Sequence, residues 1–130
     1  MNTRILMGAS AAFYGIIGIG LTFLPEEVSW YWKRDTGTIS IIILQLLGAA
    51  YIGFAMLNWM TKDNLVGGIY SKPLVVGNLV HFLVSAFALI KIIGITEIHF
   101  EIILALNIIY AVFTICFGFI MMTNPGRVKA

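Results

Sequence analysis

The sequence predicts an all-α fold: an integral membrane four-helix bundle with the N- and C-termini on the cytoplasmic side. Three observations lead to it, namely few charged residues, four apolar stretches of membrane-spanning length, and short polar segments between them. Hydrophobic residues make up 60% of the 130 residues and charged residues only 11%, whereas soluble proteins carry about 25% charged residues. So little polar surface cannot cover a soluble domain, and we expect lipid to surround the outer face.

The four apolar stretches lie at residues 5–24, 39–60, 74–93 and 97–122. Each is close to the roughly 20 residues that a helix needs to cross a bilayer. Membrane β-barrels use strands of about ten residues that alternate apolar and polar positions, and these stretches are longer and do not alternate. The sequence therefore predicts helices, and we interpret residues 1–130 as a single transmembrane domain.

Punctuating residues mark the ends of these stretches. The first ends at Pro25, and no A-x-A-like site follows it, so we interpret it as a retained span and not as a signal peptide. Thr38 and Thr96 precede the second and fourth stretches as expected N-caps, and Pro73 fits the first turn of the third. The fourth stretch stops before the Asn-Pro-Gly break at 124–126.

The segment after the first span, PEEVSWYWKRD, places Trp30, Tyr31 and Trp32 together beside charged residues. Tryptophan and tyrosine rings favour the headgroup region, so we expect a short interfacial segment or helix that anchors the outer side. A lid over a partner or substrate is the alternative. Trp59 and Tyr70 would form the matching belt on the inner side.

Basic residues near the span ends predict the orientation, because cytoplasmic loops carry more Lys and Arg. With the N-terminus inside, the cytoplasmic side has five basic residues, and they are Arg4, Lys62, Lys72, Arg127 and Lys129. The opposite side has three, and they are Lys33, Arg34 and Lys91. Both termini are therefore expected in the cytoplasm.

Small residues in the first two spans predict how the helices pack. Lipid tails are as apolar as leucine, so helices associate in a membrane through close backbone contact and hydrogen bonds. Steps of three and four residues place one set on a single stripe of the first span, and its members are Gly8, Ala11, Gly15, Gly18 and Thr22. The small residues expected to pack against this stripe from the second span are Gly48, Ala49, Ala50 and Gly53. Packing inside the chain and contact with another subunit both fit this stripe.

Polar residues inside the spans predict a buried cluster centred on His81. Asn78, His81 and Ser85 share one face of the third span, and Asn107 and Tyr110 share a face of the fourth with Thr114. Gln45 and Asn58 lie in the second span. Polar groups are unfavourable against lipid, so we expect all of these faces to point inward and meet.

His81 has two interpretations. In the first it is structural, and its hydrogen bonds fix the register of the helices. In the second it accepts a proton or contacts a small molecule, with the neighbouring polar residues as binding groups, because an intramembrane ionisable residue is a functional candidate. No carboxylate lies in the middle of a span to orient the imidazole, so we predict no catalytic residue.

Metal and cofactor sites are not expected. His99 is the only other histidine. It lies at the outer start of the fourth span, whereas His81 lies deeper in the membrane, so the two histidines of one chain cannot both bind the iron of one haem. A zinc site needs three or four protein ligands, which this sequence does not bring together. The single cysteine, Cys116, excludes a disulfide within the chain.

The Gly-rich first span ending in LTFLP and the second-span segment LLGAAYIGFAMLNW resemble small four-helix bacterial membrane proteins of the DoxX-like group. The resemblance implies a four-helix fold in the bacterial inner membrane and no definite activity. From the sequence we expect an interaction or accessory subunit of a membrane assembly, without chemistry of its own. The alternative is a small-molecule binder or transporter built around His81. Expected partners are lipid, a second copy or other membrane subunits, and not nucleic acid.

Overall fold

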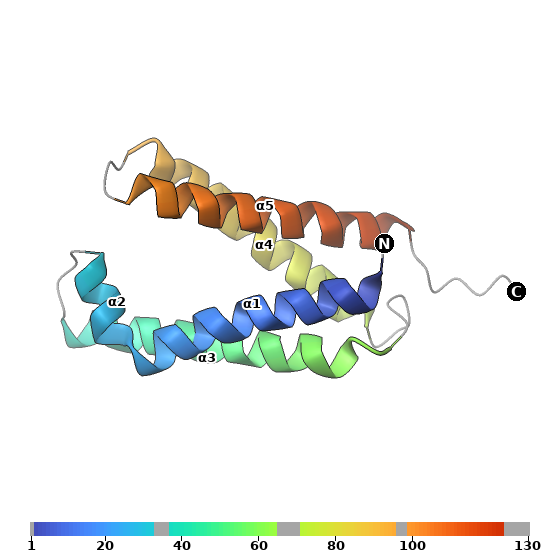
Figure 1. Ribbon diagram of the computed structural model, residues 1–130, viewed down its shortest axis with the longest axis horizontal. Coiled ribbons are helices and arrows are strands. Elements are labelled where there is room, and N and C mark those ends of the chain that lie inside the picture. The colour runs from blue at the N-terminus through green and yellow to red at the C-terminus, as the bar shows by residue number, and fades with distance from the viewer. Residues whose placement is uncertain (1, 33–36, 65–70, 96–98, 124–130) are drawn as a thin grey trace, which may run out of the picture. The chain divides into compact units, whose positions relative to one another are not determined.

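The computed structural model describes residues 2–32, 37–64, 71–95 and 99–123, and these residues form helices and turns without a strand. The helices in chain order are α1 (Thr3–Phe23), α2 (Pro25–Tyr31), α3 (Thr38–Thr61), α4 (Lys72–Ile93) and α5 (Phe100–Thr123) (Figure 1). The predicted all-α fold is confirmed for this part of the chain.

Four of the helices are long and apolar enough to cross a membrane: α1 with 21 residues, α3 with 24, α4 with 22 and α5 with 24. At about 1.5 Å per residue each reaches the thickness of the hydrocarbon core. The predicted first three spans agree with α1, α3 and α4 to within two residues at each end. The chain therefore has the helices of an integral membrane protein.

The helix ends follow most of the predicted signals. Pro25 and Pro73 lie in the first turns of α2 and α4, where a missing N–H leaves no helix hydrogen bond unmade. Thr38 is the first residue of α3 and not its cap, because Gly37 takes the N-cap position with an extended backbone. Thr96, like the Asn-Pro-Gly break and Tyr70, lies outside the described residues.

The start of α5 is set by His99, whose φ of 54° places it in the left-handed region. Its carbonyl accepts hydrogen bonds from the N–H groups of Ile102 at 3.0 Å and Ile103 at 3.1 Å. Histidine is among the residues enriched in this backbone region. His99 thus turns the chain into the last long helix.

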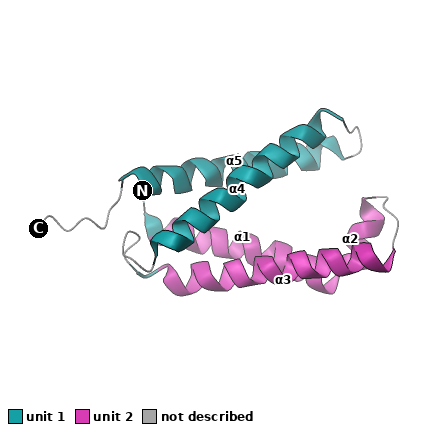
Figure 2. Ribbon diagram, turned by 180° about the vertical axis from the view of Figure 1, so that it is seen from behind, with its two compact units in different colours: residues 1–3, 63–130 teal, residues 4–62 magenta. Residues whose placement is uncertain are grey.

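The chain divides into two compact units, residues 4–62 and residues 1–3 with 63–130 (Figure 2). The first holds α1, α2 and α3, and the second holds α4 and α5. In each unit the two long helices lie side by side and run antiparallel (Figures 1 and 2). We call them the α1–α3 hairpin and the α4–α5 hairpin and describe each by itself.

In the α1–α3 hairpin the two backbones touch at Gly18 and Gly48. A Cβ added at Gly18 would lie 2.8 Å from Cγ1 of Ile52 and 2.9 Å from its backbone nitrogen. A Cβ added at Gly48 would lie 2.8 Å from the backbone nitrogen of Thr22, and it would also collide with the Thr22 hydroxyl. Only glycine fits at either position, so the pair fixes where the helices cross.

The rest of the predicted stripe is in looser contact. Ala11 is buried, and a Cβ at Gly15 would make ordinary contact with Ala55 at 3.8 Å. Added Cβ atoms at Gly8 and Gly53 would meet nothing within 4 Å. The close approach is therefore confined to one end of the stripe.

Away from the two glycines, the side chain of Tyr14 occupies the space between α1 and α3. Its ring is fully buried, stacks on Phe54 with centroids 5.3 Å apart, and meets Tyr51 edge-on at 5.4 Å. Such offset and edge-to-face contacts are the preferred geometries of aromatic rings. The α1–α3 hairpin thus joins a backbone contact to an aromatic one.

Phe82 is the centre of the α4–α5 hairpin. This buried ring stacks on Phe113 at 4.7 Å and on Phe117 at 5.7 Å, and it meets Tyr110 edge-on at 5.5 Å. One side chain from α4 therefore touches three rings from α5. Aromatic side chains therefore form the centre of the contact between the two helices.

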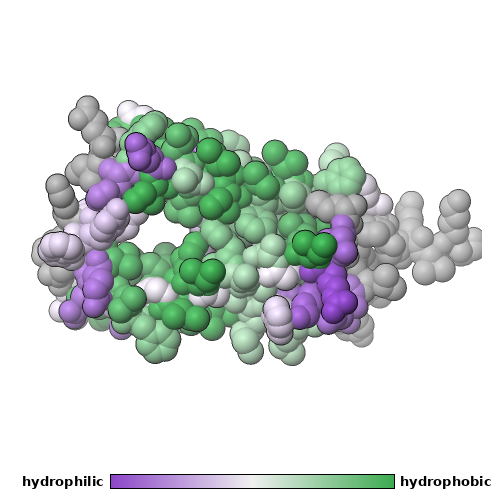
Figure 3. All heavy atoms as spheres, in the orientation of Figure 1, coloured by the Kyte–Doolittle hydropathy of each residue, from purple (hydrophilic) through white to green (hydrophobic). Residues whose placement is uncertain are grey.

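The predicted segment after the first span is the short helix α2, which packs on α3. Pro25 and Ser29 are buried, whereas Trp30 is 76% exposed. At the far end of α3, the Lys62 ammonium lies 3.0 Å from the centre of the Trp59 ring, which is cation–π geometry. On the face drawn in Figure 3, hydrophobic residues cover the long helices and hydrophilic residues gather toward the helix ends.

Candidate functional site

The α4–α5 hairpin holds five of the six predicted binding residues. The imidazole of His81 and the ring of Tyr110 lie 6.1 Å apart between centroids, tilted by 37°. His81 also meets Phe82 edge-on at 5.6 Å. The structure therefore brings His81 and Tyr110 together from different helices, at the edge of the Phe82 aromatic cluster.

Asn78 and Thr114 direct their polar groups to their own helices. The buried Asn78 amide donates a hydrogen bond to the Leu74 carbonyl at 2.8 Å, four residues earlier. The Thr114 hydroxyl donates to the Tyr110 carbonyl at 2.8 Å, again four residues earlier. Short polar side chains commonly bond to the carbonyl one turn back. Both bonds reduce the polarity of a span without joining two helices.

Asn107, on α5, has a buried polar atom without a hydrogen-bond partner. Its Oδ1 is buried and accepts no hydrogen bond within the described residues. Asn107 lies three residues before Tyr110, so both occupy one face of α5. An amide oxygen in this position can accept a hydrogen bond from a water molecule or from a ligand donor.

The remaining two predicted residues are placed differently. Ser85 is half-buried on α4, one turn beyond His81. Gln45 belongs to the other hairpin and is exposed on α3. The expectation that Gln45 turns inward is therefore not met within its own hairpin.

A hydrogen bond between polar side chains crosses the α1–α3 hairpin; Asn58 was expected to face inward, but its partner Ser10 was not predicted. The Asn58 amide donates to the Ser10 hydroxyl at 2.9 Å, and that hydroxyl donates to the Met7 carbonyl at 3.0 Å. Asn58 and Ser10 are both fully buried. The signal was the spacing of Met7, Ser10 and Tyr14, which step by three and four residues along one face.

The chemistry available at these sites is hydrogen bonding. Neither α4 nor α5 has a carboxylate in its middle turns, since Glu101 is in the first turn of α5. Among the residues that the structure describes, no group of three His, Cys, Asp or Glu side chains could hold a metal ion. The arrangement can orient helices or hold a neutral molecule with hydrogen-bonding groups.

Comparison with protein-family models, curated proteins and solved structures finds no match to this chain. The resemblance to the DoxX-like group stays a prediction.

Proposed function

We propose that this protein is a four-span bundle of the bacterial inner membrane, of the DoxX-like kind, with both termini in the cytoplasm. In this proposal it acts as an interaction or accessory subunit of a membrane assembly and performs no chemistry of its own. The pairing of polar groups inside the hairpins is the observation that carries it.

Four of the polar side chains in the spans are engaged in hydrogen bonds within the hairpins. Asn58 bonds across to Ser10, Asn78 bonds back to Leu74, and Thr114 bonds back to Tyr110. A catalytic centre needs several groups that converge on a reacting atom. Groups already bonded to the helices support a structural role, which suits a subunit that holds its partners in place.

The orientation is supported by the ends of α3 and α4. Lys62 lies over Trp59 at the end of α3, and Lys72 is the first residue of α4. Paired basic and aromatic side chains suit the cytoplasmic headgroup region. The exposed Trp30 and Tyr31 of α2 then anchor the opposite interface.

The test is purification of the tagged full-length chain in a mild detergent, followed by quantitative mass spectrometry of protein and small molecules. The proposal expects a second membrane protein at a fixed ratio, retained when His81→Leu is purified in parallel. Recovery of the chain without any protein at a constant ratio, in several mild detergents, would contradict it.

Binding of a small molecule is the second candidate, and the buried Oδ1 of Asn107 favours it. A ligand with an N–H or O–H group would satisfy this acceptor beside the His81–Tyr110 pair. If this candidate is right, a small molecule co-purifies with the parent protein and with the control Phe87→Ala, whose side chain is 60% exposed, but is lost from Asn107→Leu. Equal amounts in Asn107→Leu and the parent would rule this candidate out.

A further inference from the structure

The exposed Gln45 of α3 is an unusual residue for a span. It is the eighth residue of a 24-residue helix that is otherwise strongly apolar, so it lies about 10 Å from the helix start, inside the hydrocarbon layer. Its side chain is exposed, and no hydrogen bond joins it to the described residues. An amide facing lipid is unfavourable because hydrocarbon offers it no partner.

Small residues continue the same face. Ala49 and Gly53 follow Gln45 at steps of four, and both are exposed. An added Cβ at Gly53 would meet nothing within 4 Å. Steps of four between small residues are the pattern by which membrane helices approach closely in right-handed pairs. Gln45, Ala49 and Gly53 together are called the Gln45 face.

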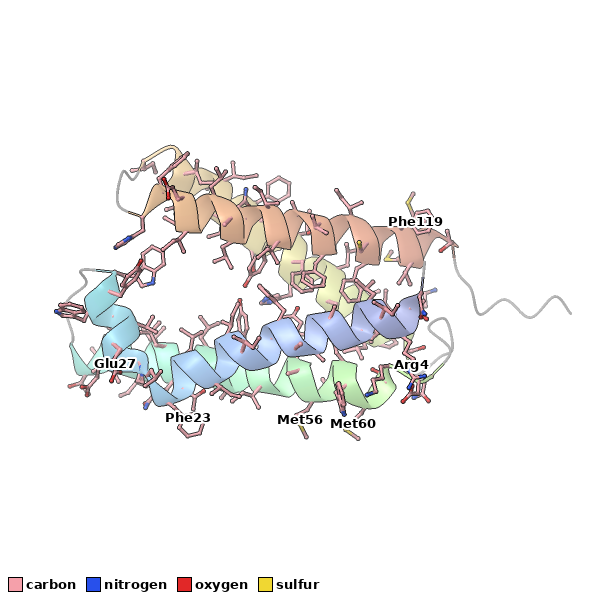
Figure 4. The ribbon with its side chains drawn as sticks, viewed as in Figure 1. Arg4, Phe23, Glu27, Met56, Met60 and Phe119 are labelled. Carbon is pink, nitrogen blue, oxygen red and sulfur yellow. The ribbon has the colours of Figure 1, made fainter. Side chains whose placement is uncertain are left out.

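The Gln45 face is separate from the contact with α1. That contact uses Gly48 and Tyr51, and Asn58 at the far end. Met56 lies on the Gln45 face at helical spacing, because it follows Gly53 by three residues. Figure 4 shows Met56 and Met60 pointing away from α1. This face is therefore available after the hairpin has formed.

We propose that the Gln45 face binds the same face of a second copy of this chain within the membrane. The side chain of glutamine both donates and accepts hydrogen bonds, so two copies related by a twofold axis satisfy each other at Gln45. A twofold interface needs a self-complementary patch, and the small residues one and two turns further on let the backbones come close enough. The inference rests on the proposed membrane location.

Disulfide crosslinking in the native membrane tests the inference. In a Cys116→Ser background, single cysteines replace Ala49 or Ala50, which are adjacent, identical and both exposed but about 100° apart around the helix. Mild oxidation is expected to crosslink Ala49→Cys into a species of twice the mass, at least about tenfold more efficiently than Ala50→Cys. Equal crosslinking of the two variants, or no dimer with Ala49→Cys, would overturn the proposal.

Two further variants, measured by energy transfer between labelled copies in liposomes, identify what holds the pair. Gln45→Leu removes the shared hydrogen bonds and is expected to weaken association about threefold to tenfold. Gly53→Ile separates the backbones and should weaken it further, whereas Ala50→Ile should leave it unchanged. Dimers that tolerate Gln45→Leu and Gly53→Ile would refute the assignment of this face.

The same crosslinked membranes also show whether a second copy or another part of the same chain covers the Gln45 face. If Ala49→Cys instead crosslinks to a single cysteine on α4 or α5 of the same chain, without a doubling of mass, the chain covers its own face and the dimer is excluded. Carbonate washing of the same membranes checks the underlying proposal. Protein that leaves with the wash contradicts the membrane location, whereas retained protein without dimers contradicts only the dimer.

Discussion

The α1–α3 and α4–α5 hairpins solve the same packing problem by different means. In the first, Gly18 and Gly48 bring two backbones into contact, and Asn58 bonds across to Ser10. In the second, Phe82 stacks on rings of α5, and Asn78 bonds within its own helix. Because lipid competes equally for apolar side chains, either close backbone contact or well-matched ring contact can supply the missing attraction.

The largest expected effect breaks the ring contact of the α4–α5 hairpin. Phe82→Ala removes the side chain that touches three rings of α5, and truncation of a buried phenylalanine costs about 3 kcal/mol or more. Phe87→Ala on the same helix is the control, because Phe87 is 60% exposed and its loss should change stability by less than about 0.5 kcal/mol. Denaturation in mixed micelles measures both, and similar losses would contradict the central role of Phe82.

A smaller effect is expected from the backbone contact of the α1–α3 hairpin. Gly48→Ala places a Cβ 2.8 Å from the Thr22 backbone nitrogen, and the overpacking is expected to cost about 2 kcal/mol. Gly8→Ala has nothing within 4 Å and should be neutral or slightly stabilising, since alanine favours helix. The comparison fails if the two alanine variants unfold at the same denaturant concentration.

The smallest effect concerns the hydrogen bond between Asn58 and Ser10. A double-mutant cycle with Asn58→Ala and Ser10→Ala should give a coupling of about 0.6 kcal/mol, the average between membrane helices, and no more than about 1.7 kcal/mol. Additive effects for Asn58 and Ser10 would show that their bond contributes nothing to stability.

The sequence predicts the four long helices because length and hydropathy are local properties. The positions of Pro25 and Pro73 follow in the same way, since proline acts on its own turn. A stripe such as Gly8 to Thr22 shows which residues share a face, but not how the partner helix is rotated against it. The sequence therefore could not predict that Gly18 makes the close contact and that Gly8 does not.

The candidate site was less predictable because hydrogen bonds depend on reach. Asn78 was expected to face inward, and it is fully buried, but the sequence did not predict that its amide donates to a carbonyl one turn back, an alternative that every helix offers to a short polar side chain. Gln45 was expected to face inward, and it is exposed on α3. Asparagine and glutamine have the same hydropathy, so hydropathy cannot tell a buried amide from an exposed one. The rotation of each helix about its axis decides which residue is buried.

The contact between Gly18 and Gly48 also has an entropic consequence. Glycine has no side-chain rotamers to lose, and the neighbours that close over the contact are Ile52 and Thr22, which are β-branched and already restricted when their helices form. Bringing α1 and α3 together therefore orders few additional torsions, whereas the ring cluster of α4 and α5 must select a rotamer for each phenylalanine. The first two long helices are built to join with little loss of freedom.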